Sequence, residues 1–269
     1  MDIIEAIKER RSVRSYNGEN ISAIQHRELM QIIEKAMAPD DTGSPFDGQL
    51  TIRLKSFDLK EGFSPSTYGM IKGAGDFFLL GFGDGDENAL NAGFRFEKVV
   101  LKAWEIGLGT CWIAATFKGT DFEKGESWPD GQRLKIVSPV GVASKKSLVE
   151  KIARMGARSD KRKPFSQLFF NRNFNTPLNE DSQYAESLRM LRLAPSATNS
   201  QPWRALVNED CVDFYFIKKS DWSPVDLGIG ICHFVEGEKY HGFKGEFFHK
   251  ENPEIPPTRG RYVISYRRI

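Results

Sequence analysis

Cysteine and histidine are scarce in this sequence. Its 269 residues include only three cysteines, Cys111, Cys211 and Cys232, and four histidines. The cysteines are odd in number, and neither residue type shows the spacing of metal ligands. A disulfide framework is therefore excluded and no metal site is expected. We expect three buried thiols in a protein of a reducing compartment.

The sequence also lacks an excess of charge of either sign. Lys and Arg number 38 against 36 Asp and Glu, which gives a formal net charge of +2. So small an excess does not create the basic field that nucleic acids and anionic membranes attract. We therefore expect neither a nucleic-acid partner nor a membrane partner.

Long apolar runs are missing as well. The longest, residues 77–82, is interrupted by Gly81 and is far shorter than the roughly 20 residues that a membrane-spanning helix needs. Residues 1–16 contain no apolar stretch of the length found in signal sequences. These absences predict a soluble protein of the cytoplasm.

The sequence does contain enough apolar residues for a full core. Hydrophobic residues make up 40% of the chain, which at this length fits one large domain or two small ones. Apolar spacing predicts helices over residues 2–10, 21–37 and 89–106. Alternation and short apolar runs predict strands over residues 50–57, 76–82, 110–115 and 134–143, and residues 39–48 are predicted to be a loop. The fold class that follows is α+β.

Three short matches indicate an internal duplication. The matching pairs are residues 38–44 with 194–200 at an offset of 156, Gly93 and Gly107 with Gly228 and Gly242 at an offset of 135, and residues 14–17 with 172–175. Each match alone arises easily by chance, but the three occur in the same order along the chain. We therefore predict a diverged tandem duplication.

Three motifs together resemble the FMN-dependent nitroreductase family. They are IKERRSVRSY at residues 7–16, EIGLGTCWI at 105–113 and APSATNSQPWRALV at 194–207, the last being the most specific. Ordinary members of that family carry all three motifs in one subunit that dimerises, whereas this chain spreads them over two halves. The resemblance implies a nitroreductase-like fold formed as a single-chain pseudo-dimer of two diverged α/β repeats, residues 1–163 and 164–269, in a monomer.

The resemblance implies that the first motif holds the FMN phosphate. Arg10, Arg11, Ser12 and Arg14 offer several charge-assisted donors at the end of a helix, which suits a group with close to two negative charges. The alternative is a solvated basic helix end. Arg162, just before a proline, resembles the family's late basic residue at the same phosphate, and a surface charge run is nearly as good an explanation.

The APS motif is implied to face the flavin ring. Pro195, Ser196, Ala197 and Asn199 belong to a polar loop between two prolines, and such a rigid loop suits a ring that gains negative charge on reduction. The alternative is an ordinary helix-to-strand turn with Trp203 in the core.

The glycines of the remaining motif have two explanations of equal weight. Gly107, Leu108 and Gly109 follow a predicted helix, where glycine is first of all a C-cap residue. The resemblance adds that the backbone here passes close to the flavin N5, where a side chain would block the approach.

Carried over residue by residue, the resemblance implies one flavin site across the two halves. The first half would supply Arg10, Arg11, Ser12, Arg14, Gly107, Leu108, Gly109 and Arg162, and the second Pro195, Ser196, Ala197 and Asn199. The equivalent second site has Leu168 and Phe169 in place of an arginine pair, keeps only Arg172, and has Asp40, Asp41 and Gly43 in place of Ser196, Ala197 and Asn199. An acidic loop beside an electron-rich flavin is unfavourable, so we predict a single competent site.

The function implied by the resemblance is that of a flavin oxidoreductase. FMN accepts a hydride from NADH or NADPH and passes the reducing equivalents to an electron-poor small molecule, such as a nitroaromatic or a quinone. No side chain is assigned as a catalytic acid or base. Two alternatives stay open: a flavin-binding pseudoenzyme that holds FMN without turnover, and an FMN-free interaction protein.

Overall fold

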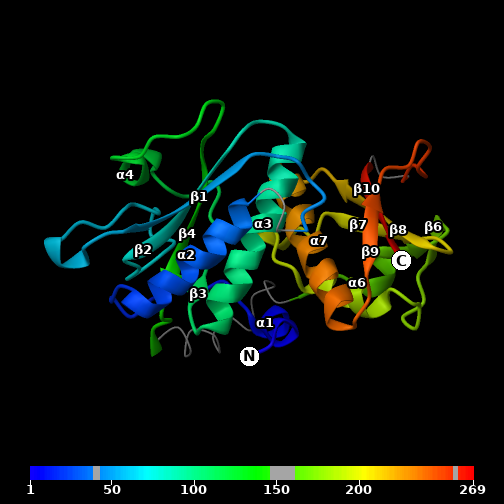
Figure 1. The fold of residues 1–269 in the computed structure, drawn as a ribbon, viewed down its shortest axis with the longest axis horizontal. Helices are drawn as coiled ribbons and strands as arrows, with labels where there is room; N and C mark the ends of the chain where they lie inside the picture. Colours follow the sequence, from blue (N-terminus) through cyan, green and yellow to red (C-terminus); the bar gives the residue numbers. More distant parts are fainter. Residues whose placement is uncertain (39–42, 146–160, 257–259) are drawn as a thin grey trace. The chain divides into compact units, whose positions relative to one another are not determined.

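The computed structural model describes residues 1–38, 43–145, 161–256 and 260–269. The chain divides into two units, Met1–Arg158 and Ser159–Ile269. Each unit combines helices with a sheet, as the ribbon in Figure 1 shows. The predicted α+β class is confirmed.

The first unit starts with two helices and then continues through strands and helices. Its elements are α1 (Ile3–Glu9), α2 (Ala23–Met37), β1 (Leu50–Ser56), η1 (Leu59–Glu61), β2 (Asp76–Phe82), α3 (Asp86–Glu105), β3 (Gly109–Thr110), α4 (Gly119–Glu123) and β4 (Arg133–Gly141). Within the described residues its strands pair antiparallel in the order β1-β2-β4-β3. Helices α2 and α3 pack against each other and against the sheet (Figure 1).

Side-chain caps set the start of the first two helices. Asp2 and Glu5 form a reciprocal capping box at α1, and Ser22 and Gln25 form another at α2. Each box satisfies amide groups that have no partner within the helix. The predicted helices at residues 2–10 and 21–37 are therefore confirmed to within two residues at each end.

Helix α3 ends in a turn that requires glycine. Gly107 has a φ of 83°, and its amide donates to the Trp104 carbonyl at 3.0 Å. The Leu108 amide donates to the Ala103 carbonyl at 2.8 Å. These two bonds form a Schellman motif, whose left-handed residue glycine adopts without strain. The C-cap interpretation of Gly107 is confirmed.

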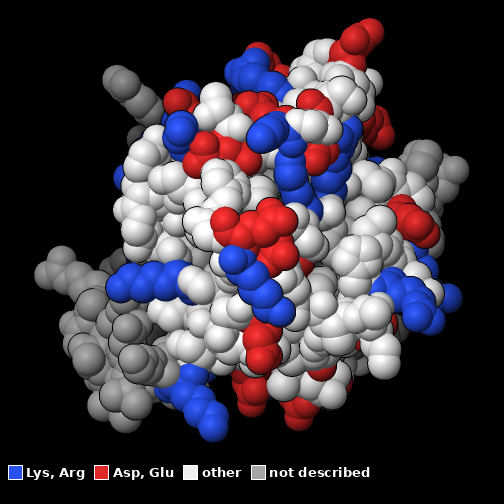
Figure 2. All heavy atoms as spheres, turned by 90° about the vertical axis from the view of Figure 1, so that its left-hand side faces the viewer, with Lys and Arg blue, Asp and Glu red and all other residues white. Residues whose placement is uncertain are grey.

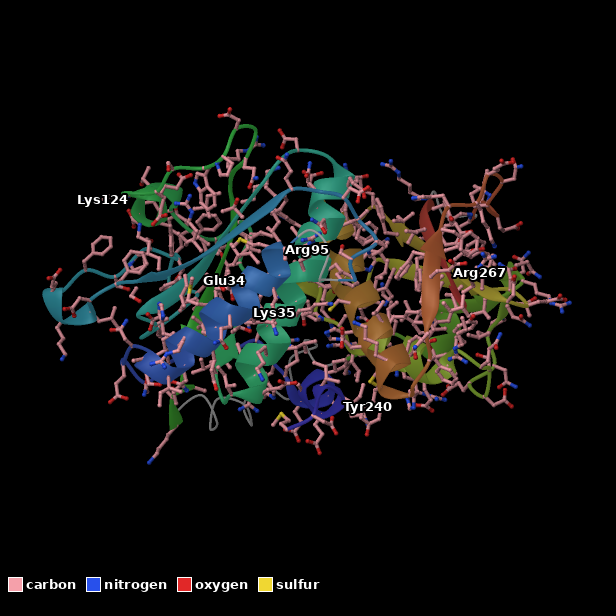
Figure 3. The ribbon with its side chains drawn as sticks, viewed as in Figure 1. Glu34, Lys35, Arg95, Lys124, Tyr240 and Arg267 are labelled. Carbon is pink, nitrogen blue, oxygen red and sulfur yellow. The ribbon has the colours of Figure 1, made fainter. Side chains whose placement is uncertain are left out.

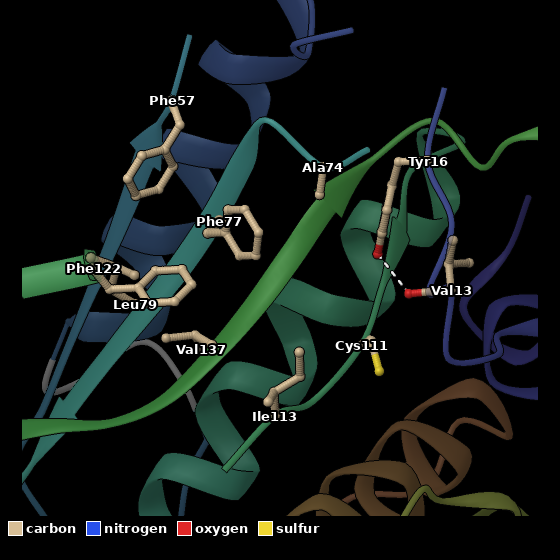
Figure 4. Close-up of a cluster of buried hydrophobic side chains, with 10 residues drawn as sticks. All are labelled: Val13, Tyr16, Phe57, Ala74, Phe77, Leu79, Cys111, Ile113, Phe122 and Val137. Atoms are coloured by element: carbon tan, nitrogen blue, oxygen red, sulfur yellow. Dashed lines mark hydrogen bonds between the residues drawn. The ribbon is translucent and has the colours of Figure 1, made fainter. Parts of the chain in front are cut away.

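Strand β2 forms the centre of the first unit's core. All seven of its residues are buried between β1 and β4. Phe77 packs edge-on against Phe57 and Phe122, with ring centroids 5.8 and 5.1 Å apart. Figure 4 shows these rings in one apolar cluster with Val13 and Cys111. The core therefore extends to the segment that follows α1.

Arg95 joins α3 to the end of α2. Its Nη1 donates to the carbonyl oxygens of Ala36 at 3.2 Å and Ala38 at 2.8 Å. Figure 3 labels this side chain on α3. A guanidinium at the C-terminal end of a helix satisfies carbonyl groups that the helix leaves unpaired. Arg95 thereby fixes the point where the chain leaves α2.

Within the described residues, the second unit contains a sheet of six strands. Its elements are η3 (Phe165–Gln167), β5 (Phe169–Asn171), β6 (Asn173–Pro177), α6 (Ala185–Leu193), η4 (Ala197–Asn199), β7 (Trp203–Val207), β8 (Cys211–Ile217), α7 (Ser223–Tyr240), β9 (Gly245–Phe248) and β10 (Gly260–Arg268). Its described strands follow the order β6-β5-β7-β8-β10-β9. Helices α6 and α7 pack together, and α7 contacts β7 and β8.

Four strands of the second sheet repeat the order of the first. The order β7-β8-β10-β9 corresponds to β1-β2-β4-β3, and every one of these pairs is antiparallel. Helices α2 and α6 end 156 residues apart, and α3 and α7 end 135 residues apart. Both offsets equal those of the sequence matches, and Gly242 repeats the turn of Gly107, with a φ of 79°.

The third sequence match has no such structural counterpart. Ser12 bridges to Thr110 of β3, whereas β5 pairs with β7. The segment before residues 14–17 therefore pairs with a different strand of its sheet than the segment before residues 172–175 does.

One predicted strand is largely wrong. Residues 110–115 were expected to be extended, but β3 covers only Gly109–Thr110. The Cys111 amide donates to the Ser138 hydroxyl at 3.3 Å instead of to a backbone carbonyl, and pairing resumes only at a bridge between Ile113 and Val137. The other predicted strands match β1, β2 and β4 closely. Of the predicted loop, residues 43–48 contain neither helix nor strand, and residues 39–42 lie outside the described residues.

Candidate functional site

Backbone hydrogen bonds hold residues 12–16 of the first unit in an extended conformation. The Val13 amide donates to the Thr110 carbonyl at 2.8 Å, and the Tyr16 amide donates to the Lys72 carbonyl at 2.8 Å. The Tyr16 hydroxyl donates back to the Val13 carbonyl at 2.8 Å (Figure 4). The basic segment and the glycine motif, which were identified separately in the sequence, therefore lie side by side.

Position 109 requires glycine because the Val13 side chain packs against it. A Cβ at this position would lie 2.4 Å from Cγ2 of Val13, which is too close for any side chain. Leu108 beside it is fully buried. At Gly107, by contrast, a Cβ would meet nothing within 4 Å. Of the two glycines, only Gly107 leaves its side-chain direction open.

Arg10 lies at the end of α1 and its side chain is almost completely buried. It is 4% exposed, and its Nε lies 4.0 Å from the fully buried carboxylate of Glu97. The Trp112 indole donates to the other Glu97 oxygen at 2.9 Å. In the part of the chain that the structure describes, Arg10 Nε has no hydrogen-bond partner. Glu97 therefore partly compensates the charge of Arg10, while the buried Nε donor has no acceptor among the described residues.

Ser12 and Arg14 lie next to the Cys111 thiol. Burial raises the pKa of this thiol, and Arg14, the Ser12 hydroxyl and Arg10 act in the opposite direction. Arg14 is half-buried, and no hydrogen bond or ion pair joins its guanidinium to another described residue. Arg11 instead lies over the Trp104 ring, 5.8 Å from its centroid. Arg14 therefore has the least compensated charge of the three arginines.

Sequence reasoning missed Lys72, which joins this basic group through the backbone. Its amide donates to the Arg14 carbonyl at 2.9 Å, and it pairs in parallel with Ser15. No local signal pointed to this lysine, since only the pairing of two distant segments brings it here.

The polar loop of the second unit, residues 196–201, has a strained backbone. Thr198, Asn199 and Gln201 have φ angles of 51°, 55° and 48°. Non-glycine residues rarely adopt this region, a β-branched residue least of all, and each such residue costs on the order of 1–3 kcal/mol. Strain of this kind persists only where the surroundings impose it, and it clusters at functional sites.

Basic side chains and one amide hold this 196–201 loop in place. Arg162 donates to the Leu193 carbonyl at 2.9 Å and to Asn199 Oδ1 at 3.3 Å. Lys163 Nζ donates to the carbonyls of Ser200 and Gln201. The Gln201 side chain accepts from the Lys163 amide at 2.8 Å. The structure therefore places Arg162 with the APS loop in the second unit.

Asp226 is a further residue at this loop that sequence reasoning missed. Its Oδ1 accepts the Ala197 amide at 2.9 Å, and the residue is 3% exposed. Burial raises its pKa to about 7, against the opposing effects of the Ala197 amide and the Ser200 hydroxyl. The offset of 135 was the available signal, since it matches Asp226 to the buried Asn91.

Trp203 and the described residues of the equivalent second site lie in the core or on the surface. Trp203, Leu168 and Phe169 are fully buried apolar side chains. Arg172 forms an exposed ion pair with Glu209 at 2.7 Å. Gly43 keeps a left-handed φ of 60°. Asp40 and Asp41 lie outside the described residues.

Other classes of site find little support in the described part of the chain. All three cysteines are buried, as predicted. No group of three or more potential metal ligands occurs among the described residues. No described helix is both long and apolar enough to cross a membrane. Figure 2 shows acidic and basic side chains interspersed on the face that it draws.

Comparison with known proteins gives matches along most of the chain. Residues 2–237 match the family model described as "Putative TM nitroreductase". A structure described as a putative nitroreductase from Thermotoga maritima MSB8 is 18% identical, with a TM-score of 0.62, and the alignment covers 100% of this chain and 94% of that one. This similarity extends over both units and shows a common fold.

Other solved structures match about half of the chain. A nitroreductase family protein from Clostridium novyi NT is 21% identical, with a TM-score of 0.41, covering 54% of this chain and 89% of that one. A nitroreductase with bound FMN from Bacteroides fragilis NCTC 9343 is 16% identical, with a TM-score of 0.39, covering 54% and 90%. No curated protein matches the chain.

Proposed function

The chain belongs to the nitroreductase family described as "Putative TM nitroreductase", and from this premise we propose that it is an FMN-dependent oxidoreductase. It takes reducing equivalents from NADH or NADPH and passes them to an electron-poor small molecule, such as a nitroaromatic or a quinone. The observation that carries the proposal is the pairing of Ser12 and Val13 with Thr110 of β3, which joins the basic segment to the end of α3.

The residues of the basic segment fit a phosphate. Arg10 has a buried Nε without a hydrogen-bond partner among the described residues, and Ser12 adds a hydroxyl beside it. The Arg14 guanidinium is joined by no ion pair to the described part of the chain. A buried cationic group with unused donors favours an anion with several acceptor oxygens. FMN carries such an anion.

The strained loop at residues 196–201 supports the proposed place of the flavin ring. When bound, FMN supplies the redox chemistry, and the protein binds, orients and tunes it. Arg14 and Ser12 hold the phosphate, and Ser196, Ala197 and Asn199 form a preorganised polar edge for the ring. No side chain of the chain is proposed as a general acid.

We propose further that one chain forms one complete site. The two halves, residues 1–163 and 164–269, are diverged repeats that act as a pseudo-dimer in a monomer. The shared strand order and the shared turn at Gly107 and Gly242 support the duplication. Fully buried Leu168 and Phe169 leave the equivalent second site without a phosphate cradle.

The test is a titration of the flavin-free protein with FMN, followed by anaerobic mixing with NADH and with NADPH. We expect one FMN per chain and bleaching of the flavin absorbance by at least one donor. Two equivalents of similar affinity would contradict the single site. Bound flavin that neither donor bleaches would indicate a flavin-holding protein without turnover.

Gly107→Ala and Gly242→Ala form a matched pair that tests the glycine motif. Both glycines are left-handed and a Cβ at either would meet nothing within 4 Å. Alanine in this conformation costs about 1 kcal/mol at each position. Because only a ligand could meet the new methyl group, we expect weaker FMN binding for Gly107→Ala alone. Equal FMN affinities in the two variants, measured by fluorescence titration, would place Gly107 away from the flavin.

A further inference from the structure

Asp226 is a buried acid to which the proposed function gives no role. Its Oδ1 accepts the Ala197 amide at 2.9 Å, while its Oδ2 has no hydrogen-bond partner in the described part of the chain. The Ser200 hydroxyl, at the other end of the same turn, lies beside the carboxyl group. One side chain of α7 therefore faces both ends of the strained turn.

The turn between Ala197 and Ser200 depends on contacts from outside. Thr198 and Asn199, its two central residues, are both left-handed. Within the turn, the Asn199 amide donates to the Ser196 carbonyl at 2.9 Å and the Ser200 amide to the Ala197 carbonyl at 3.0 Å. The Ala197 amide itself takes no part in these bonds and donates to Asp226 instead. Asp226 is thus the contact through which α7 holds the loop.

The first unit offers an internal comparison at the matching position. There Asn91 Oδ1 accepts the Ser44 hydroxyl at 2.8 Å, and Ser44 and Asn91 match Ser200 and Asp226 at the two offsets of the duplication. Asn91 is fully buried and carries no charge. An amide can therefore fill this place in the fold, so the charge on Asp226 is not required for packing.

The other charged side chains near the loop are all basic. They are Lys161, Arg162 and Lys163 before η3, Arg192 on α6, Arg204 on β7 and Lys219 before α7. His233 lies two turns further along α7, and its ring faces the Met190 carbonyl at 3.2 Å. Asp226 variants are therefore needed to assign a pH effect on the loop to this carboxyl group.

We propose that Asp226 is a positioning residue for the flavin site: it holds the 196–201 loop through the Ala197 amide, and its protonation state sets how tightly the loop binds the flavin ring. This inference rests on the proposed function for its ligand. The physical reason is that a flavin ring brings electron-rich atoms to the loop, which disfavour a nearby buried carboxylate. Protonation of Asp226 and flavin binding then favour each other.

The first experiment uses the flavin-free protein and needs no ligand. The NMR shift and the hydrogen-exchange protection factor of the Ala197 amide are followed between pH 5 and 9 in the wild type, Asp226→Asn and Asp221→Asn. Asp221 is an exposed acid just before α7, so its variant makes the same change of charge outside the loop. We expect the amide to titrate in the wild type and in Asp221→Asn, and to be flat in Asp226→Asn. Titration that persists in Asp226→Asn would overturn the proposal.

The second experiment measures FMN dissociation constants of the same proteins over the same pH range. Dividing the wild-type value by that of Asp226→Asn removes the titration of the FMN phosphate itself. We expect this ratio to rise by about tenfold from low to high pH, which corresponds to a flavin-induced pKa shift of about one unit. The wild-type to Asp221→Asn ratio should stay constant.

The outcomes separate the inference from the proposed function. A ratio for Asp226→Asn that does not change with pH would overturn the role of Asp226 at the flavin, even if FMN binds well. Failure of the wild type to bind FMN at any pH would contradict the proposed function and the flavin part of the inference together. The NMR measurement of the Ala197 amide in the flavin-free protein would then still test whether Asp226 holds the loop.

Discussion

Replacing Asp226 by asparagine is expected to stabilise the flavin-free protein at pH 8 by about 2–4 kcal/mol. The pKa of this buried carboxyl is raised to about 7, well above the value of about 3.9 in an unfolded chain. Such a group favours the folded state when protonated. Wild-type stability should therefore fall as the pH rises from about 4 to about 7 and level off above that. Asparagine keeps an acceptor for the Ala197 amide and removes the buried charge.

The measurement is chemical denaturation of the wild type, Asp226→Asn and the exposed-site control Asp221→Asn at pH 4.5, 6 and 8. The advantage of Asp226→Asn should be small at pH 4.5 and grow through pH 6 to pH 8. Asp221→Asn should change stability little at any of these pH values, because exposed ion pairs contribute little. A variant that is less stable than the wild type at pH 8 would show that the ionised carboxylate supports the fold.

Arg14→Ala is expected to weaken FMN binding by about 1.5–3 kcal/mol, or roughly 10-fold to 150-fold in dissociation constant. The half-buried guanidinium has no ion pair with the described residues, so its removal strands no buried partner. Arg10 is less suitable for this test, because Arg10→Ala would leave the buried Glu97 carboxylate uncompensated. Loss of affinity in Arg14→Ala therefore reports on the ligand.

Riboflavin and Arg172→Ala supply the two controls for this prediction. Riboflavin lacks the phosphate, so Arg14→Ala should change its affinity far less than that of FMN. Arg172, the matching arginine of the second half, is exposed and paired with Glu209. Its variant should bind FMN normally. Equal losses for FMN and riboflavin in Arg14→Ala would mean that this arginine acts on the ring or on folding.

The sequence by itself determined most elements of the first unit and the family. Capping residues such as Ser22 and Gln25 are local signals, so the first helices could be predicted closely. The buried run at residues 76–82 predicted β2 to the residue. The offsets of 156 and 135 between the sequence matches equal the offsets between the ends of the helices. The motifs named the family that the comparison then showed.

The tertiary structure alone decided which side chains lie next to one another. The charge on Arg10 is partly compensated because a buried carboxylate from α3 lies beside it, and Gly109 is required by Val13. No local signal identified Lys72, and only the offset of 135 pointed to Asp226, because hydrogen bonds between distant segments bring both residues to their loops. Local spacing determines helices and strands, whereas burial and charge compensation depend on neighbours that only the folded chain brings together.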